Sequence, residues 1–348
     1  MEYKVVQILS SREFYKMVDI LNEILESDNI CILDFTDVVG IDAVVIPNLL
    51  LLGRYIEKKT NNIPYIRLGE DLSAGYLKKY LLGIKFYELS DSYFYYEDAI
   101  GKYGGLVGKS MDKRNTTECF KFEDGVVVAQ RRLFYKVLPF IENYLDVFRK
   151  EKINTSGVMD KNAFCNNDIA HFLKEMIENT FLYAGTDVII TVQTNYKKGK
   201  IFLSVSDPGI GFYRSMQDNM DEKGNFLPRE GEVDCGRNIL GRRPKNEEEA
   251  ILVGIYKRVQ SKTYGLFNVI KKILELKGIV RIHSNDRQII LTERLQNQFL
   301  KGTLLKNIEQ LRGYNIINTS LFQGVHFEME LPLSIMSEEG VLNVYNKR

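Results

Sequence analysis

The chain has 348 residues, of which 45% are hydrophobic and 27% charged, so it is long enough for two domains that each bury a core. Its 47 basic and 46 acidic residues give a net charge of +1, so nothing indicates a nucleic acid or another polyanion as partner. We expect a cytoplasmic protein without a membrane partner, because no apolar run spans a membrane, the N-terminus does not resemble a signal peptide and the four cysteines form no CxxC pair.

Residues 1–98 alternate strand and helix patterns. The expected elements are helices at about 12–25, 42–59 and 72–82 and strands at 30–35 and 63–68. Ser10 or Ser11 is placed to cap the first helix. The strand at 30–35 is almost continuously apolar, which is typical of a sheet covered on both faces. This alternation predicts an α/β domain.

The middle of the chain reads as a connection. Residues 99–125 are rich in Gly, Lys and Asp, and 126–150 are apolar at helical spacing. The long helix predicted there packs within one chain or against a second copy, which leaves a homodimer open. We therefore assign 99–166 to a linker and connecting helix, 167–334 to a second domain and 335–348 to a C-terminal tail.

The second domain is predicted to mix helices and strands. The expected helices lie at about 168–183, 248–260 and 266–276, and the expected strands at 188–194, 201–206, 279–283, 288–292 and 325–331. Residues 212–248 are polar and glycine-rich with little periodicity, so we expect a long loop there. A loop of that length inside a compact domain is functional or disordered.

Three separated motifs of this domain carry polar groups suited to a ligand. Glu175 and Asn179 are four residues apart and share one face of a helix. Asp207-Pro-Gly209-Ile-Gly211 follows a strand, where glycines let the backbone approach a ligand closely. Gly265 and Leu266 begin a helix whose free N–H groups suit phosphate. Alone, the first motif is more typical of a solvated helix face, the second of a glycine-rich turn and the third of an ordinary helix start.

In this order and spacing the motifs resemble the GHKL family of ATP-binding domains, which includes histidine kinases, gyrase, MutL and heat-shock chaperone ATPases. The resemblance covers residues 167–334 and ends in Gly324-x-x-Phe-x-x-x-Leu-Pro332. It implies an α+β two-layer sandwich of the Bergerat type that binds ATP with Mg²⁺.

The resemblance also implies roles for the motif residues. Asn179 would coordinate Mg²⁺, Glu175 would be the catalytic general base and Asp207 would accept a hydrogen bond from the adenine amino group. Gly209 and Gly211 would make room for the base, and Gly265 and Leu266 would contact the phosphates. The loop from 212 to about 260 would be an ATP lid, whose cations either reach the phosphates or are simply solvated: Arg214, Arg229, Arg237, Arg242, Arg243 and Lys245.

The chain departs from the family pattern at several positions. The segment before Gly265 is poor in glycine, which puts the phosphate contact in doubt. Val325 stands where a threonine often follows the last glycine, so a water-mediated adenine contact is expected to be missing. Glu178 lies close to Glu175, and one of the two is a bystander.

The N-terminal half resembles a STAS domain, the fold of anti-sigma-factor antagonists. The resemblance lies in Ile-Leu-Asp34-Phe, in Val39-Gly-Ile-Asp42-Ala43 and in the following helix and strand. It implies a domain that binds another protein. Ala43 occupies the place of the serine that is commonly phosphorylated in that family, so this switch is expected to be absent.

These resemblances predict a signalling protein with an ATP-binding domain, either a Mg²⁺-dependent ATPase or a nucleotide-controlled protein-interaction switch. The alternatives are a serine kinase of the anti-sigma-factor type and a non-catalytic nucleotide-binding scaffold. Autophosphorylation of the histidine-kinase type is not expected, since the three histidines (His171, His283 and His326) all lie inside the predicted ATP domain.

Overall fold

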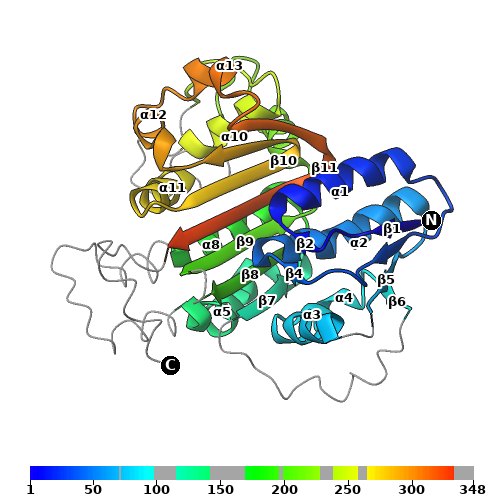
Figure 1. The fold of residues 1–348 in the computed structure, drawn as a ribbon. Helices are drawn as coiled ribbons and strands as arrows, with labels where there is room; N and C mark the ends of the chain where they lie inside the picture. Colours follow the sequence, from blue (N-terminus) through cyan, green and yellow to red (C-terminus); the bar gives the residue numbers. More distant parts are fainter. Residues whose placement is uncertain are drawn as a thin grey trace, which may run out of the picture.

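The computed structural model describes residues 1–69, 72–97, 115–141, 169–195, 199–227, 238–257 and 265–332. Within these ranges the chain is a mixed α/β protein with a four-stranded, a five-stranded and a two-stranded sheet (Figure 1). No helix of the described part has both the length and the apolar character needed to cross a membrane. The predicted tail at 335–348 lies outside the described residues.

The N-terminal half is built on a parallel sheet. Its strands lie in the order β1 (Glu2–Lys4), β3 (Ile32–Asp34), β5 (Tyr65–Arg67) and β6 (Tyr95–Tyr96). The other elements are α1 (Ser11–Ile24), η1 (Ala43–Val45), α2 (Ile46–Thr60), α3 (Leu72–Gly83), α4 (Phe86–Ser90) and the paired strands β2 (Ile8–Leu9) and β4 (Gly40–Ile41). The side chain of Ser10 accepts a hydrogen bond from the Glu13 amide and caps α1. The predicted alternation of strands and helices is confirmed.

The second sheet is antiparallel throughout. Its strands lie in the order β10 (Ile279–Leu291), β11 (Ile316–Pro332), β9 (Lys200–Asp207), β8 (Val188–Asn195) and β7 (Asn115–Phe120). The longer helices are α5 (Gly125–Lys136), α8 (Ala170–Asn179), α9 (Gly211–Asp218), α10 (Glu247–Tyr256) and α11 (Leu266–Glu275). The short helical segments are η3 (Phe122–Asp124), η5 (Thr180–Ala184, π-helical), η6 (Glu293–Leu295), α12 (Gln296–Leu300), η7 (Leu305–Asn307) and α13 (Ile308–Leu311).

The connection predicted at 99–166 was wrong for residues 115–120, which form strand β7 of the second sheet. Strand β7 pairs with β8 along six residues, and the following helix α5 packs into the same core as α8. Its first four residues, Asn-Thr-Thr-Glu, show no apolar pattern, yet all are buried. The Thr117 hydroxyl lies 2.9 Å from that of Thr191, so a cross-strand hydrogen bond satisfies these two hydroxyls. Residues 99–114 and 142–168 lie outside the described residues.

Three further predictions about this half were wrong. Helix α9 occupies the start of the segment expected to be a loop at 212–248. Strand β10 runs through the expected break between 283 and 288, because Ser284–Arg287 form an irregularity in the strand pairing rather than a turn. Strand β11 also begins earlier than expected, at Ile316 rather than at 325.

The antiparallel sheet is covered on both faces. On one face Val205, Phe327 and their neighbours pack against the helices α5, α8, α10 and α11. On the other face α1 lies against β11, and η1 and α2 lie against β9 (Figure 1). The rings of Phe14 and Phe322 meet at 5.3 Å, and Tyr15 stacks on His283 at 4.4 Å. The N-terminal half therefore adds a third layer to the expected two-layer sandwich.

This contact between the halves is rich in buried polar groups. The Asn48 amide nitrogen donates to Glu328 Oε1 at 3.1 Å, and its oxygen accepts from the Ser206 hydroxyl at 2.6 Å.

Burial raises the pKa of Glu328 from 4.5 to about 7. Burial also lowers the pKa values of His283 and His326, so both histidines are uncharged at neutral pH.

We predict that Glu328→Gln makes the protein more stable at pH 8 and flattens its pH dependence. A carboxyl whose pKa is raised in the folded state binds a proton on folding. Its contribution to the free energy of unfolding is therefore largest below pH 4.5 and is lost as the pH rises through about 7. The gain at pH 8 should be about 1–3 kcal/mol. Urea unfolding at pH 5 and pH 8 measures it.

Glu330→Gln is the control, because Glu330 lies two residues away in ion pairs with Arg281 and Lys200. Although burial acts in the opposite direction, these two cations keep the pKa of Glu330 below its ordinary value. This variant should be less stable than the parent at pH 8. A Glu328→Gln variant that loses stability at pH 8 would contradict the assignment of Glu328 as a destabilising buried charge.

Candidate functional site

One pocket opens among the helices that cover the antiparallel sheet. Its empty space, which includes the open solvent at its mouth, measures about 940 Å³. The end of β9 and helices α8, α9, α10 and α11 surround it. It is lined by Glu175, Met176, Asn179, Thr180, Tyr183, Ala184, Asp207, Ile210, Gly211, Phe212, Ser215, Met216, Asn219, Phe226, Gly254, Lys257, Gly265, Leu266 and Val325.

The structure brings the candidate residues of all three motifs together. Six of them line the pocket: Glu175, Asn179, Asp207, Gly211, Gly265 and Leu266. The seventh, Gly209, donates its backbone N–H to Asp207 Oδ1 at 2.8 Å. The three motifs therefore converge on one concave surface, although long segments separate them in the chain.

The two candidate acids of helix α8, Glu175 and Glu178, have different surroundings. Glu175 and Asn179 both line the pocket, in agreement with their spacing of one turn. Glu178 is exposed and accepts a hydrogen bond from Gln130 of α5. Of the two glutamates, only Glu175 is placed to act on a ligand in this pocket.

Asp207 is a buried carboxylate at the end of β9, with 4% of its surface exposed. Oδ1 accepts from the Gly209 amide and Oδ2 accepts from the Thr180 hydroxyl at 3.2 Å. Burial raises the pKa of Asp207 to about 6, and the hydrogen bonds from Gly209 and Thr180 oppose that rise. An ionised carboxylate offers about four acceptor positions, so Asp207 can still accept a hydrogen bond from a ligand.

The glycines near Asp207 allow protein segments to pack closely. A Cβ at Gly209 would lie 2.4 Å from the Ala184 Cβ, and one at Gly211 would lie 2.0 Å from the Asn285 side-chain nitrogen. Gly324 has a φ of +119°, and its Cβ would lie 1.9 Å from the Asp207 carbonyl oxygen. Protein atoms thus occupy the Cβ side of Gly209 and Gly211, while Gly211 also lines the pocket.

The irregular part of β10 supports the loop that follows Asp207. The Ser284 hydroxyl accepts from the Phe212 amide at 3.0 Å, and Glu247 Oε1 accepts from the Tyr213 amide at 3.2 Å. The side chain of Asn285 donates to the Ile210 carbonyl and accepts from the Gly324 amide. The start of α9 is therefore capped by protein groups, and the Asp207 loop is fixed to two neighbouring strands.

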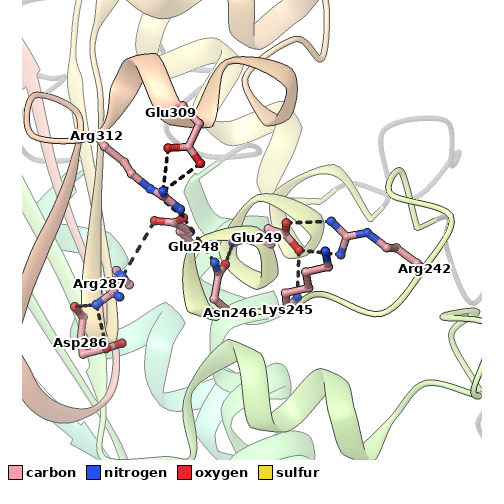
Figure 2. Close-up of polar contacts among 9 residues, drawn as sticks. All are labelled: Arg242, Lys245, Asn246, Glu248, Glu249, Asp286, Arg287, Glu309 and Arg312. Carbon is pink, nitrogen blue, oxygen red and sulfur yellow. Dashed lines mark hydrogen bonds and ion pairs between the residues drawn. The ribbon is translucent and has the colours of Figure 1, made fainter.

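Ion pairs also fix the beginning of α10 (Figure 2). Glu248, which is 2% exposed, pairs with Arg312 and lies 3.9 Å from the Arg287 guanidinium. Glu249 holds both terminal nitrogens of Arg242 at 2.8 Å. Consecutive carboxylates at a helix N-terminus also complement its dipole. These contacts join α10 to the segment around 242 and to the segment that precedes β11.

The expected lid cations that fall within the described residues do not line the pocket. Arg242 is held by Glu249, and the Arg243 guanidinium donates to the backbone carbonyls of Met220 and Asp221. Neither these two arginines nor Arg214 or Lys245 belongs to the pocket lining. Arg229 and Arg237 lie outside the described residues. The described part of the expected lid is instead helical or held by hydrogen bonds.

Lys257 and Phe226 line the pocket without having been predicted to do so. The Lys257 ammonium donates to the Tyr183 hydroxyl at 3.2 Å and lies 4.6 Å from the centre of the Phe226 ring. Within the described residues Lys257 is the one Lys or Arg of the lining. For Lys257, the only indication in the sequence was its position directly after an apolar helix. Phe226 stands in a segment without hydrophobic periodicity, so nothing in the sequence indicated its place.

Comparisons of the chain with protein-family models, curated proteins and solved structures gave no significant match. The chemistry of the pocket therefore rests on its own residues. They are the buried carboxylate of Asp207 in a largely apolar wall, and the polar side chains of Glu175, Asn179, Tyr183 and Lys257. Such a pocket suits a ligand with a flat apolar part, an amino donor and an anionic end.

We predict that Gly324→Ala destabilises the protein by several kcal/mol, because its Cβ would overlap the Asp207 carbonyl oxygen, which belongs to the backbone and cannot move cheaply. Gly313→Ala is the control: Gly313 also has a positive φ, but no atom lies within 4 Å of its added Cβ. It should lose only about 1–2 kcal/mol from backbone strain. Equal losses in urea unfolding would show that the close approach at Gly324 is not real.

Proposed function

We propose that this chain is an ATP-binding protein, with a GHKL-type nucleotide domain of the Bergerat fold and a STAS-like N-terminal domain. One observation carries the proposal: six of the seven residues singled out by three separated sequence motifs line one pocket. A chance combination of a solvated helix face, a turn and a helix start would have no reason to converge in this way.

The inner part of the pocket suits an adenine ring. Asp207 supplies an acceptor for the exocyclic amino group, and Thr180 and Gly209 hold its carboxylate in place. Apolar side chains such as Met176, Ile210 and Val325 line the surrounding wall and suit a flat aromatic ring. Because Val325 has no hydroxyl, the direct hydrogen bond to Asp207 carries the recognition of the base.

The polar group of the lining suits phosphates. Asn179 would supply an amide oxygen to Mg²⁺, and Lys257 would supply a positive charge. A Mg²⁺ ion bound there would neutralise charge on the phosphates, which fits a site with few protein ligands because this ion is usually held partly by its substrate. Glu175, one turn before Asn179, would accept a proton from the attacking water.

We propose that the activity is Mg²⁺-dependent ATP hydrolysis or a nucleotide-controlled protein interaction through the N-terminal half. The position of Glu175 in the pocket wall supports a catalytic role. Ala43 is buried in η1, so a phosphorylation switch at this place in the N-terminal half has neither a hydroxyl nor access. A serine kinase that acts on a separate protein and a non-catalytic scaffold are the outcomes that the assays below distinguish.

Asp207→Asn should weaken the binding of Mg-ATP about 10–100-fold, because a hydrogen bond to a charged group is worth about 1.5–3 kcal/mol. Isothermal titration calorimetry on parent and variant measures the change. Asp221→Asn is the control, since the Asp221 carboxylate binds the Asn225 backbone and side chain outside the pocket. The proposal fails if the parent takes up no nucleotide at millimolar concentration, and Asp207 is not the base reader if its variant binds as tightly as the parent.

Glu175→Ala should reduce ATP turnover about 10²–10⁴-fold and leave binding largely intact, because a general base acts in the transition state. Asn179→Ala should damage both, since a metal ligand also holds the ground-state complex. Glu178→Ala is the control on the same helix, because this side chain contacts α5 instead of the pocket. Steady-state ATPase assays beside binding titrations decide the roles.

The outcomes of these assays separate the candidate activities. Loss of turnover in Glu178→Ala but not in Glu175→Ala would reverse the assignment of the base. Phosphate transfer to a serine of a partner protein, with little release of free phosphate, would favour the kinase. Binding without turnover in the parent, with its partner present, would favour the scaffold.

A further inference from the structure

Consecutive residues of β9 connect the pocket to the N-terminal half. Side chains alternate between the two faces of a strand, so Asp207 points into the pocket while Ser206 points into the contact between the halves. The Ser206 hydroxyl donates to the Asn48 side-chain oxygen at 2.6 Å. Both Ser206 and Asn48 are fully buried, so water cannot replace this hydrogen bond.

Asn48 binds two strands at once. Its amide nitrogen donates to Glu328 of β11 at 3.1 Å, while its oxygen holds Ser206 of β9. Strand β11 pairs with β9 beside the pocket, with Val325 opposite Asp207. A displacement of α2 would therefore break hydrogen bonds on both strands that form this edge of the pocket.

The residue that follows Asp207 is also connected to α2. The Pro208 carbonyl accepts from the Gln323 side chain at 3.2 Å, and Gln323 accepts from the Lys58 ammonium at 3.1 Å. The bond from Lys58 is exposed to solvent and contributes less than the buried bond of Asn48. Both peptide neighbours of Asp207 are thus connected to one helix of the N-terminal half.

We propose that Asn48 is a positioning residue of the nucleotide pocket: through Ser206 it fixes the end of β9 and so the carboxylate of Asp207. This inference rests on the proposed function, because it assigns Asp207 to the ligand. Docking of the N-terminal half and nucleotide binding are then coupled. The coupling is reciprocal, so bound nucleotide strengthens the docking by the same factor.

Two serines of one strand provide the test. Ser204 lies on the same face of β9 as Ser206, is equally buried, and donates to the Val44 carbonyl at 2.9 Å. Ser204→Ala and Ser206→Ala each remove one buried hydrogen bond between the halves and should lower stability by a similar amount. Only Ser206→Ala should weaken the binding of both Mg-ATP and adenosine, about fivefold or more, because Asp207 contacts the base.

A double-mutant cycle shows whether the effect passes through Asp207. In the Asp207→Asn background, Ser206→Ala should change the affinity for adenosine by less than twofold, since residues that act through one group are not additive. If the parent binds Mg-ATP and the two serine variants bind it equally well, the positioning role is wrong while the proposed function stands. If the parent binds neither ligand, the proposed function fails and this inference fails with it.

Discussion

The burial of one carboxylate, that of Asp207, constrains the structure around the pocket. A buried carboxylate is unfavourable unless hydrogen bonds replace its lost water. The Thr180 hydroxyl and the Gly209 amide supply them, and they come from η5 and from the loop after β9. Gly324 lets β11 pass the Asp207 carbonyl at a distance that no side chain would permit. Helix, loop and strand are thus arranged around one acceptor.

The second face of the same sheet explains how the two halves of the chain fit together. Asn48 and Glu328 are buried and bonded to each other, and Ser206 is bonded to Asn48. A docking that separated Asn48 from the sheet would break both bonds, and a buried polar group left without a partner costs more than the bond itself contributes. The polar contact therefore favours one orientation. Strand β9 therefore contacts the N-terminal half through Ser206 and the pocket through Asp207.

The features that could be predicted from the sequence are those encoded by local periodicity. The spacing of Glu175 and Asn179 placed both in one helix face, and the apolar run before Asp207 placed that residue at a strand end. Strand β7 has no such pattern, because its residues Asn-Thr-Thr-Glu are polar and yet buried. Lys257 and Phe226 meet only through tertiary packing, and the glycines after Asp207 face protein segments that are distant in the chain. These features follow from long-range contacts, which no short window of sequence contains.

The most direct measurement of the central claim is a crystal structure of the chain with Mg²⁺ and a non-hydrolysable ATP analogue. We predict that the adenine amino group lies within hydrogen-bond distance of the Asp207 carboxylate and that the phosphates lie beside Asn179 and Lys257, in the pocket that these residues line. A nucleotide bound elsewhere on the molecule, or one in this pocket whose base lies away from Asp207, would contradict it.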